Sequence, residues 1–185
     1  MKFLSVLIVC LFMAVPALAD GKYEMNLGSN ALAKGDFVAA VIHLSAALDS
    51  GQLRGEATAA VLISRAQALY HLEHYPPAVD DLTVAIESGA INDTLVGIAL
   101  ATRASVYRKM GDWARAITDF DAAIALGTIN AKMYFHRGQT LEADGQRARA
   151  IEDYRRALEM APDNDAIRDR LLTLGEAVIL DRAGA

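Results

Sequence analysis

The sequence predicts an all-α protein in which pairs of helices stack into an elongated α-solenoid. Two observations lead to this class. Apolar residues recur at steps of three and four, as in the segment 113–124, and therefore share one helical face. A segment with this pattern also returns four times along the chain, which is the sequence signature of a repeat architecture. The chain of 185 residues suits one such domain.

Residues 1–19 have the layout of a secretory signal peptide. Lys2 supplies a positive start, residues 3–15 form an apolar run broken by one serine, and small residues precede an expected cleavage before Asp20. The run is short for a membrane span, which takes roughly 20 residues. We therefore expect an exported chain, periplasmic or secreted, with no integral membrane span after cleavage and a repeat domain over 20–181. An uncleaved N-terminal anchor is the alternative.

Composition excludes several classes of partner. The whole chain has a formal net charge of −5, and cleavage would remove Lys2 and the single cysteine. An exported chain without cysteine has no disulfides and must be held together by apolar packing. The acidic balance argues against nucleic acid and against an anionic membrane surface, because both repel a negatively charged protein.

Four segments align on a turn before the second helix of each pair. The turns lie at Gly35, Glu73, Gly111 and Gly145, at spacings of 38, 38 and 34 residues. A large apolar residue comes nine places after each turn and an alanine twelve places after it. Small side chains let two helices approach closely, and large ones fill the space beside them. Five places after each turn the small residue is Ala40, Ala78, Ala116 or Ala150.

The helix boundaries follow from these turns. Asp112 is a good N-cap for the helix that begins near residue 113. Pro76 and Pro77 fall in the first turn of a helix, where proline is tolerated. The two longer periods add four residues, about one helical turn, which we expect in the connections or at the helix starts near residues 56 and 93. The expected repeats span about 21–54, 59–92, 97–130 and 131–162.

A last helix is expected over 163–181. Its apolar stripe consists of Ile167, Leu171, Leu174 and Val178. A stack of repeats exposes its final apolar face unless another helix covers it. We therefore predict that this helix caps the stack.

Arginine and aspartate occur together in three of the four repeats. The first repeat has Leu27 and His43 at the two equivalent places, and so lacks both. This joint occurrence favours an ion pair between the two helices of a repeat, which fixes geometry more than it adds stability. Arginines offered to an anionic ligand are the alternative. Eight residues before and after the turns stand Arg65 and Asp81, Arg103 and Asp119, and Arg137 and Asp153.

Paired helices with a period near 34 residues resemble the tetratricopeptide repeat family. Pro162 matches the proline that closes a repeat in that family, and a small residue seven places before each turn matches it too: Gly28, Ala66, Ala104 and Gly138. The resemblance covers roughly residues 21–162. It implies a right-handed superhelix of helix–turn–helix repeats, in which the first helices line a concave groove for a peptide or a partner helix.

The resemblance also implies which residues face that groove. They are polar or positively charged side chains suited to holding a peptide by hydrogen bonds: Lys22, Asn26, Ser29, Ser64, Gln67, His71, Thr102, Ser105, Lys109, Lys132, His136 and Gln139. One branch of the family grips C-terminal carboxylates with lysine, asparagine and arginine. That clamp is absent here, because the matching positions hold Met25, Ser29, Ser64, Ile98 and Thr102.

The sequence contains no GxSxG, HExxH or CxxC motif and no phosphate-binding glycine loop. We therefore predict no catalytic residues, no cofactor and no metal. His71 and His74 are spaced by three, but two histidines without a further ligand are a weak sign of a metal site or of a hydrolase. A polar helix end is the favoured interpretation.

The predicted function is a non-catalytic protein-interaction scaffold of the bacterial envelope or periplasm, with a protein or peptide partner in the groove. The alternative is a docking or assembly subunit of a secretion or envelope machine that acts mainly through oligomerisation. The sequence leaves the partner and the oligomeric state open.

Overall fold

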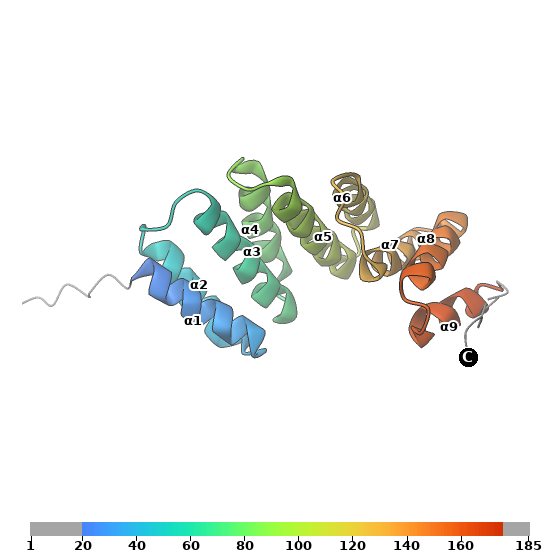
Figure 1. Cartoon of the computed structure of the whole chain (residues 1–185), viewed down its shortest axis with the longest axis horizontal. Helices are drawn as coiled ribbons and strands as arrows, with labels where there is room; N and C mark the ends of the chain where they lie inside the picture. Colours follow the sequence, from blue (N-terminus) through green and yellow to red (C-terminus); the bar gives the residue numbers. More distant parts are fainter. Residues whose placement is uncertain (1–19, 176–185) are drawn as a thin grey trace, which may run out of the picture.

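The computed structural model describes residues 20–175, which form nine α-helices and no strand. The expected signal peptide and the end of the expected cap, including Val178, lie outside these residues. The all-α repeat fold is confirmed. The helices follow one another along the long axis of the molecule (Figure 1), as α1 Gly21–Ala33, α2 Phe37–Asp49, α3 Glu56–His71, α4 Tyr75–Glu87, α5 Asp93–Met110, α6 Trp113–Ala125, α7 Ala131–Ala143, α8 Arg147–Met160 and α9 Asp165–Thr173.

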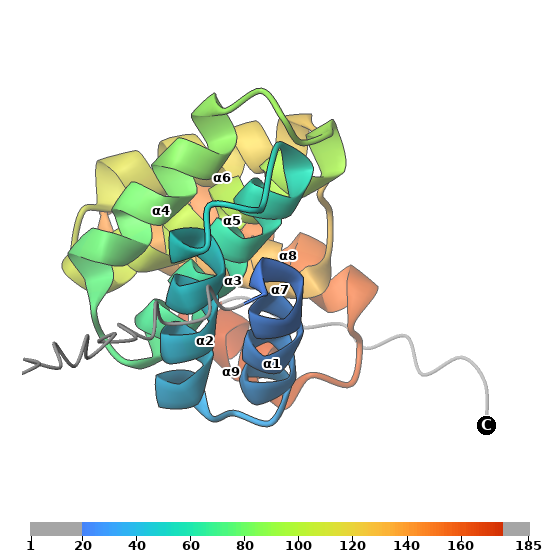
Figure 2. The ribbon, with the colours of Figure 1, turned by 90° about the vertical axis from the view of Figure 1, so that its left-hand side faces the viewer.

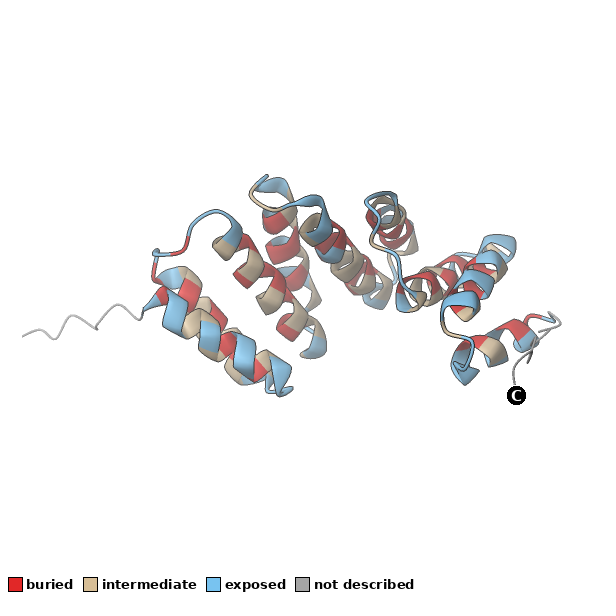
Figure 3. Cartoon of the chain, viewed as in Figure 1, coloured by how far each residue is buried: buried red, intermediate tan, exposed pale blue. Residues whose placement is uncertain are grey.

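The helices are arranged as successive antiparallel pairs. α1 packs on α2, α3 on α4, α5 on α6 and α7 on α8, and each second helix also packs on the first helix of the following pair. Seen from the α1 end, the pairs lie one behind another (Figure 2). Buried residues therefore form a continuous line through the stack, while exposed residues cover the outside of each pair (Figure 3).

The four extra residues of the longer repeats lengthen their first helices. α3 has 16 residues and α5 has 18, whereas α1 and α7 have 13 each. Both long helices begin earlier relative to their turns, at Glu56 and Asp93. The extra residues were expected either in the connections or at the helix starts, and the structure places nearly all of them at the helix starts.

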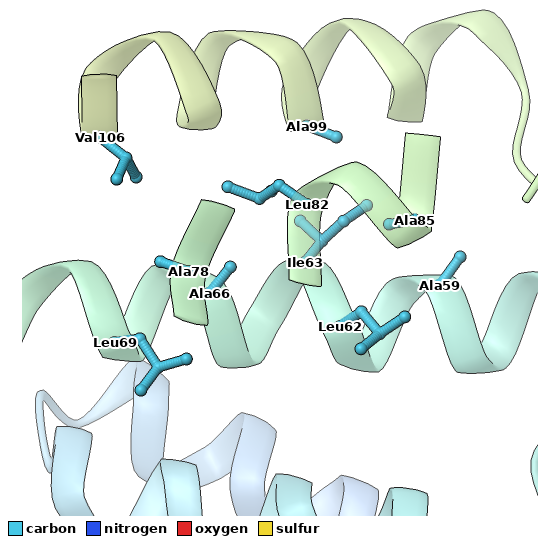
Figure 4. Close-up of a cluster of buried hydrophobic side chains, with 10 residues drawn as sticks. All are labelled: Ala59, Leu62, Ile63, Ala66, Leu69, Ala78, Leu82, Ala85, Ala99 and Val106. Atoms are coloured by element: carbon cyan, nitrogen blue, oxygen red, sulfur yellow. The ribbon is translucent and has the colours of Figure 1, made fainter. Parts of the chain in front are cut away.

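Small residues occupy the contacts between the helices of a pair. The alanines five places after the turns, Ala40, Ala78, Ala116 and Ala150, are all 0% exposed. A β-carbon on Gly138 of α7 would lie 2.7 Å from the ring of Tyr154 on α8, closer than real contacts allow. In the second repeat the cluster that includes Ala66, Ala78 and Leu82 is closed by α5 (Figure 4).

Each of the three arginines joins three helices. Arg137 Nε and Nη2 donate to both carboxylate oxygens of Asp153 at 2.7 Å, and Arg65 and Arg103 bind Asp81 and Asp119 in the same way. A third donor, Nη1, reaches the second helix of the preceding repeat. Nη1 of Arg65 donates to Ser45, Nη1 of Arg103 to Thr83, and Nη1 of Arg137 to Asp121.

These contacts are structural. The hydrogen bonds that Arg137 donates to Asp153 raise the pKa of the Arg137 guanidinium above its ordinary value, so its charge is permanent. The predicted interhelical pairs are therefore present, and the alternative of arginines offered to a ligand does not hold for these three side chains. In the first repeat, His43 Nδ1 instead lies 2.7 Å from Glu24 Oε2.

The turns and caps follow the sequence closely. Gly35, Gly111 and Gly145 have φ between 77° and 80°, the left-handed region that only glycine enters without strain. Glu73 adopts the same conformation at φ 61°, so the turn geometry is kept where the glycine is missing. Asp112 accepts the backbone N–H of Arg115 at 3.0 Å, as expected of an N-cap.

The last described helix covers the end of the stack. In α9, Ile167 and Leu171 are 1% and 2% exposed and pack in one cluster with Leu141 and Tyr154. Arg170 Nε donates to Glu142 at 2.8 Å, and the Tyr154 hydroxyl donates to the same carboxylate at 2.9 Å. Residues 165–173 therefore cover the end of the stack as the apolar stripe predicts, but the helix ends at Thr173, earlier than the expected 181.

Candidate binding groove

A groove of about 650 Å³ crosses the first helices of the stack. It begins at the end of α1, crosses α3 and α5, and ends at the start of α7. We call this surface the groove. Its lining residues are Leu32, Ala33, Gly35, Phe37, Gln67, Tyr70, His71, Ile98, Ala101, Thr102, Ser105, Phe120, Thr128, Asn130, Lys132, Met133 and His136.

Half of the predicted groove residues lie in this wall. They are Gln67, His71, Thr102, Ser105, Lys132 and His136. They share a wall because equivalent positions of α3, α5 and α7 face the same side of the stack. Their role in binding a partner stays a prediction.

The other six predicted residues lie outside the lining. Lys22, Asn26 and Ser29 are exposed along α1, which contributes to the groove only through its last residues, Leu32 and Ala33. Lys109 is exposed near the end of α5. The remaining two, Ser64 of α3 and Gln139 of α7, are half-buried.

An aromatic rim closes the α1–α3 end of the groove. The rings of Phe37 and His71 stack with centroids 4.2 Å apart and planes 8° from parallel. Tyr70 meets His71 edge to face at 5.3 Å. Phe37 and Tyr70 are not among the predicted groove residues. An aromatic residue two places after the turn recurs in three repeats, as Phe37, Tyr75 and Trp113, and is a signal for the first of them.

The two histidines that are three residues apart do different things. His71 belongs to the aromatic rim, while His74 is the exposed N-cap residue of α4. Within residues 20–175, no three or more histidine, cysteine, aspartate or glutamate side chains come together in a way that could hold a metal ion.

The middle of the groove offers hydrogen-bonding groups on small side chains. Thr102 Oγ1 donates to the carbonyl of Ile98 at 2.8 Å, and Ser105 Oγ donates to the carbonyl of Ala101 at 2.9 Å. Each hydroxyl oxygen keeps the capacity to accept a hydrogen bond from a ligand. With Gln67 beside them, these groups can bind the backbone of an extended peptide.

The α5–α7 end of the groove is positively charged. Burial lowers the pKa of the His136 imidazole, and the charges of Arg108, Lys132 and Lys109 lower it further. Gln139 Oε1 lies 3.2 Å from His136 Nδ1, and this hydrogen bond opposes the shift. Since the ordinary pKa is about 6.5, His136 is mainly neutral at pH 7 in the free protein.

Comparison with known proteins identifies the type of repeat. Residues 102–165 match the tetratricopeptide repeat pattern, and solved tetratricopeptide repeat proteins share the fold along most of the chain. The chain contains tetratricopeptide repeats. Its paired helices, small contact residues and closing cap are thus the features of a tetratricopeptide repeat stack. No curated protein matches the chain in sequence.

Three solved structures illustrate the likeness. Residues 41 to the end of MamA from Desulfovibrio magneticus RS-1 are 18% identical, with a TM-score of 0.72 over 85% of this chain and 84% of that one. YrrB, described as a tetratricopeptide repeat protein with an unusual peptide-binding site, is 19% identical, with a TM-score of 0.70 over 84% and 75%. The first tetratricopeptide domain of human RPAP3 is 27% identical, with a TM-score of 0.59 over 65% and 92%.

Tetratricopeptide repeats are protein-interaction modules, and a protein-interaction role is what this fold suggests for the chain. Within the described part of the chain, every helix is too short or too polar to cross a membrane.

Proposed function

We propose that the chain is a non-catalytic scaffold whose groove holds an extended segment of a partner protein. The observation that carries this proposal is the groove itself, where four first helices present hydroxyl, amide and apolar groups to one open channel. Two similar structures support it: the first tetratricopeptide domain of RPAP3 is described as bound to an HSP90 peptide, and YrrB as having a peptide-binding site.

We further propose that the scaffold works in the bacterial envelope or periplasm. The support is the sequence of residues 1–19, with its positive start, apolar run and small residues before Asp20. The chain isolated from the envelope fraction is then expected to begin at Asp20, as measured by intact mass. A chain that retains Met1 in the cytoplasm would contradict this location.

Changing Gln67 and Thr102 together to glutamate is expected to weaken partner binding at least about tenfold while the fold is kept. Both side chains line the middle of the groove and neither has a buried partner to lose. The added charges would leave peptide backbone carbonyls facing carboxylates. The measurement is recovery of partners from envelope extract on the immobilised chain, with helicity checked by circular dichroism.

The matched control places two glutamates on second helices, at Thr118 of α6 and Ala148 of α8, both exposed and outside the groove. This variant is expected to recover the same partners as the unchanged chain. Equal recovery by the groove variant and the control would show that partners bind elsewhere.

One observation favours the assembly subunit as a second candidate. Val38 and Ile42, four residues apart on α2, are 57% and 61% exposed and share one face of that helix. Such a face could join copies of the chain. Light scattering of the purified chain separates the two functions, because a stable homo-oligomer is expected only if self-association is the main role.

A further inference from the structure

We infer that the segment held in the groove is acidic, and that at least two of its carboxylate side chains lie against a cationic end. This end consists of Lys132 in the lining, beside the neutral His136, with Arg108 and Lys109 just beyond the lining. This inference rests on the proposed function and names the chemistry of the partner. It concerns the place where the end of α5 meets the start of α7.

The first support is the charge of the wall. The chain has 23 aspartates and glutamates against 18 lysines and arginines, yet the lining residues of the groove include neither aspartate nor glutamate. The formally charged side chain among them is Lys132. An acidic segment would therefore meet no like charge in the groove, although the chain as a whole has a net negative charge.

The second support is that Arg108 has no acidic partner in the described part of the chain. Arg65, Arg103 and Arg137 each bind an aspartate with two donors. Arg108 is half-buried, and its Nε–H is buried with no hydrogen-bond partner. The Arg108 charge therefore has no counterion in the described part of the chain, and a ligand carboxylate beside the exposed part of this half-buried side chain would supply one.

The third support is that the cations lie close together. Lys132 and His136 stand one turn apart on α7 and both line the groove, while Arg108 and Lys109 follow the lining residue Ser105 by one turn on α5, which contacts α7. The charges of Arg108, Lys132 and Lys109 all lower the pKa of the His136 imidazole. Within residues 20–175 no ion pair neutralises Arg108, Lys109 or Lys132, and three positive charges are more than one carboxylate neutralises. A segment with several acidic side chains fits this end better than a lone C-terminal carboxylate does.

The experiment is a selection from a bead library of acetylated and amidated peptides of about ten residues, ~33 Å when extended, with random sequence. The unchanged chain is expected to retain peptides enriched in aspartate and glutamate. A retained acidic peptide should bind about tenfold more weakly to the Arg108→Ala/Lys132→Ala variant. Its affinity for the unchanged chain should also fall as salt is raised from roughly 50 to 500 mM.

Arg149→Ala is the matched control, because Arg149 is an exposed arginine of α8 outside the groove. The affinity of the Arg149→Ala variant for the acidic peptide is expected to stay within about twofold of that of the unchanged chain. Should the Arg108→Ala variant lose helicity, Lys132→Ala and Lys132→Glu decide the outcome, since Lys132 is exposed on α7. The charge reversal should then weaken binding more than the alanine does.

The outcomes separate this inference from the proposed function. Peptides that lose binding to the Gln67→Glu/Thr102→Glu variant but show no acidic enrichment would overturn the inference and leave the groove as a peptide site. Failure to retain any peptide that depends on the groove would overturn both. Retention only in a parallel library with free C-termini, whatever the side chains, would also overturn the inference.

Discussion

Replacing Asp153 with alanine is expected to lower the free energy of unfolding by about 3–5 kcal/mol. The Asp153 side chain is 4% exposed, and Arg137, whose two donors it accepts, is 13% exposed. Without Asp153 the guanidinium stays charged and keeps its contact with Asp121, but it loses the two acceptors that best offset its removal from water. Urea unfolding followed by circular dichroism measures the loss.

Two variants test whether the loss comes from the Arg137 charge that no longer has Asp153 beside it. Asp80→Ala removes an exposed carboxylate from α4 and is expected to change stability by less than about 0.5 kcal/mol. Changing Arg137 to methionine and Asp153 to leucine together removes both charges, and should cost much less than Asp153→Ala alone. An Asp153→Ala chain as stable as the unchanged one would show that the pair does not hold the repeats in place.

Ala116→Leu is expected to cost about 1–3 kcal/mol by overpacking. Ala116 is 0% exposed on α6, and its equivalents Ala78 and Ala150 lie inside the clusters that join the helices of their repeats. Three additional carbon atoms have no space there unless α5 and α6 move apart. Thermal unfolding followed by circular dichroism should show a lower midpoint.

The control for this prediction is Ala114→Leu, two residues earlier on the same helix. Ala114 is exposed, so the added side chain reaches solvent and the midpoint should hardly change. If the two leucine variants melt alike, close approach at the alanine positions is not what fixes the spacing of the helices.

The sequence predicts the repeated contacts well because each of them recurs. Ala40, Ala78, Ala116 and Ala150 recur at one place after the turn, and the structure buries all four. The arginine–aspartate pairs were predictable since both partners are present or absent together. The acceptor on the preceding repeat was not predictable, because it is a serine for Arg65, a threonine for Arg103 and an aspartate for Arg137, so no single residue type marks the position.

The groove is predictable only in part, for a geometric reason. The position of a residue in its repeat fixes the face of its helix, which places Gln67, Thr102 and Ser105 correctly in the wall. Where the groove crosses each helix depends on helix length and on how successive pairs are turned. It crosses α1 at its end, so Lys22 and Asn26 lie outside the lining. Nor does a sequence reveal which arginine is left without an acid, and so Arg108 was missed.

The central claim is that stacked helix pairs present one groove to a partner protein. Its most direct test is photo-crosslinking in intact cells from a reactive amino acid placed at Ser105, in the groove, and separately at Thr118, on the outer surface of α6. We predict that Ser105 yields an adduct that mass spectrometry maps to a single segment of another protein, and that Thr118 yields none. The same adduct from both positions, or only copies of this chain joined through Ser105, would contradict the claim.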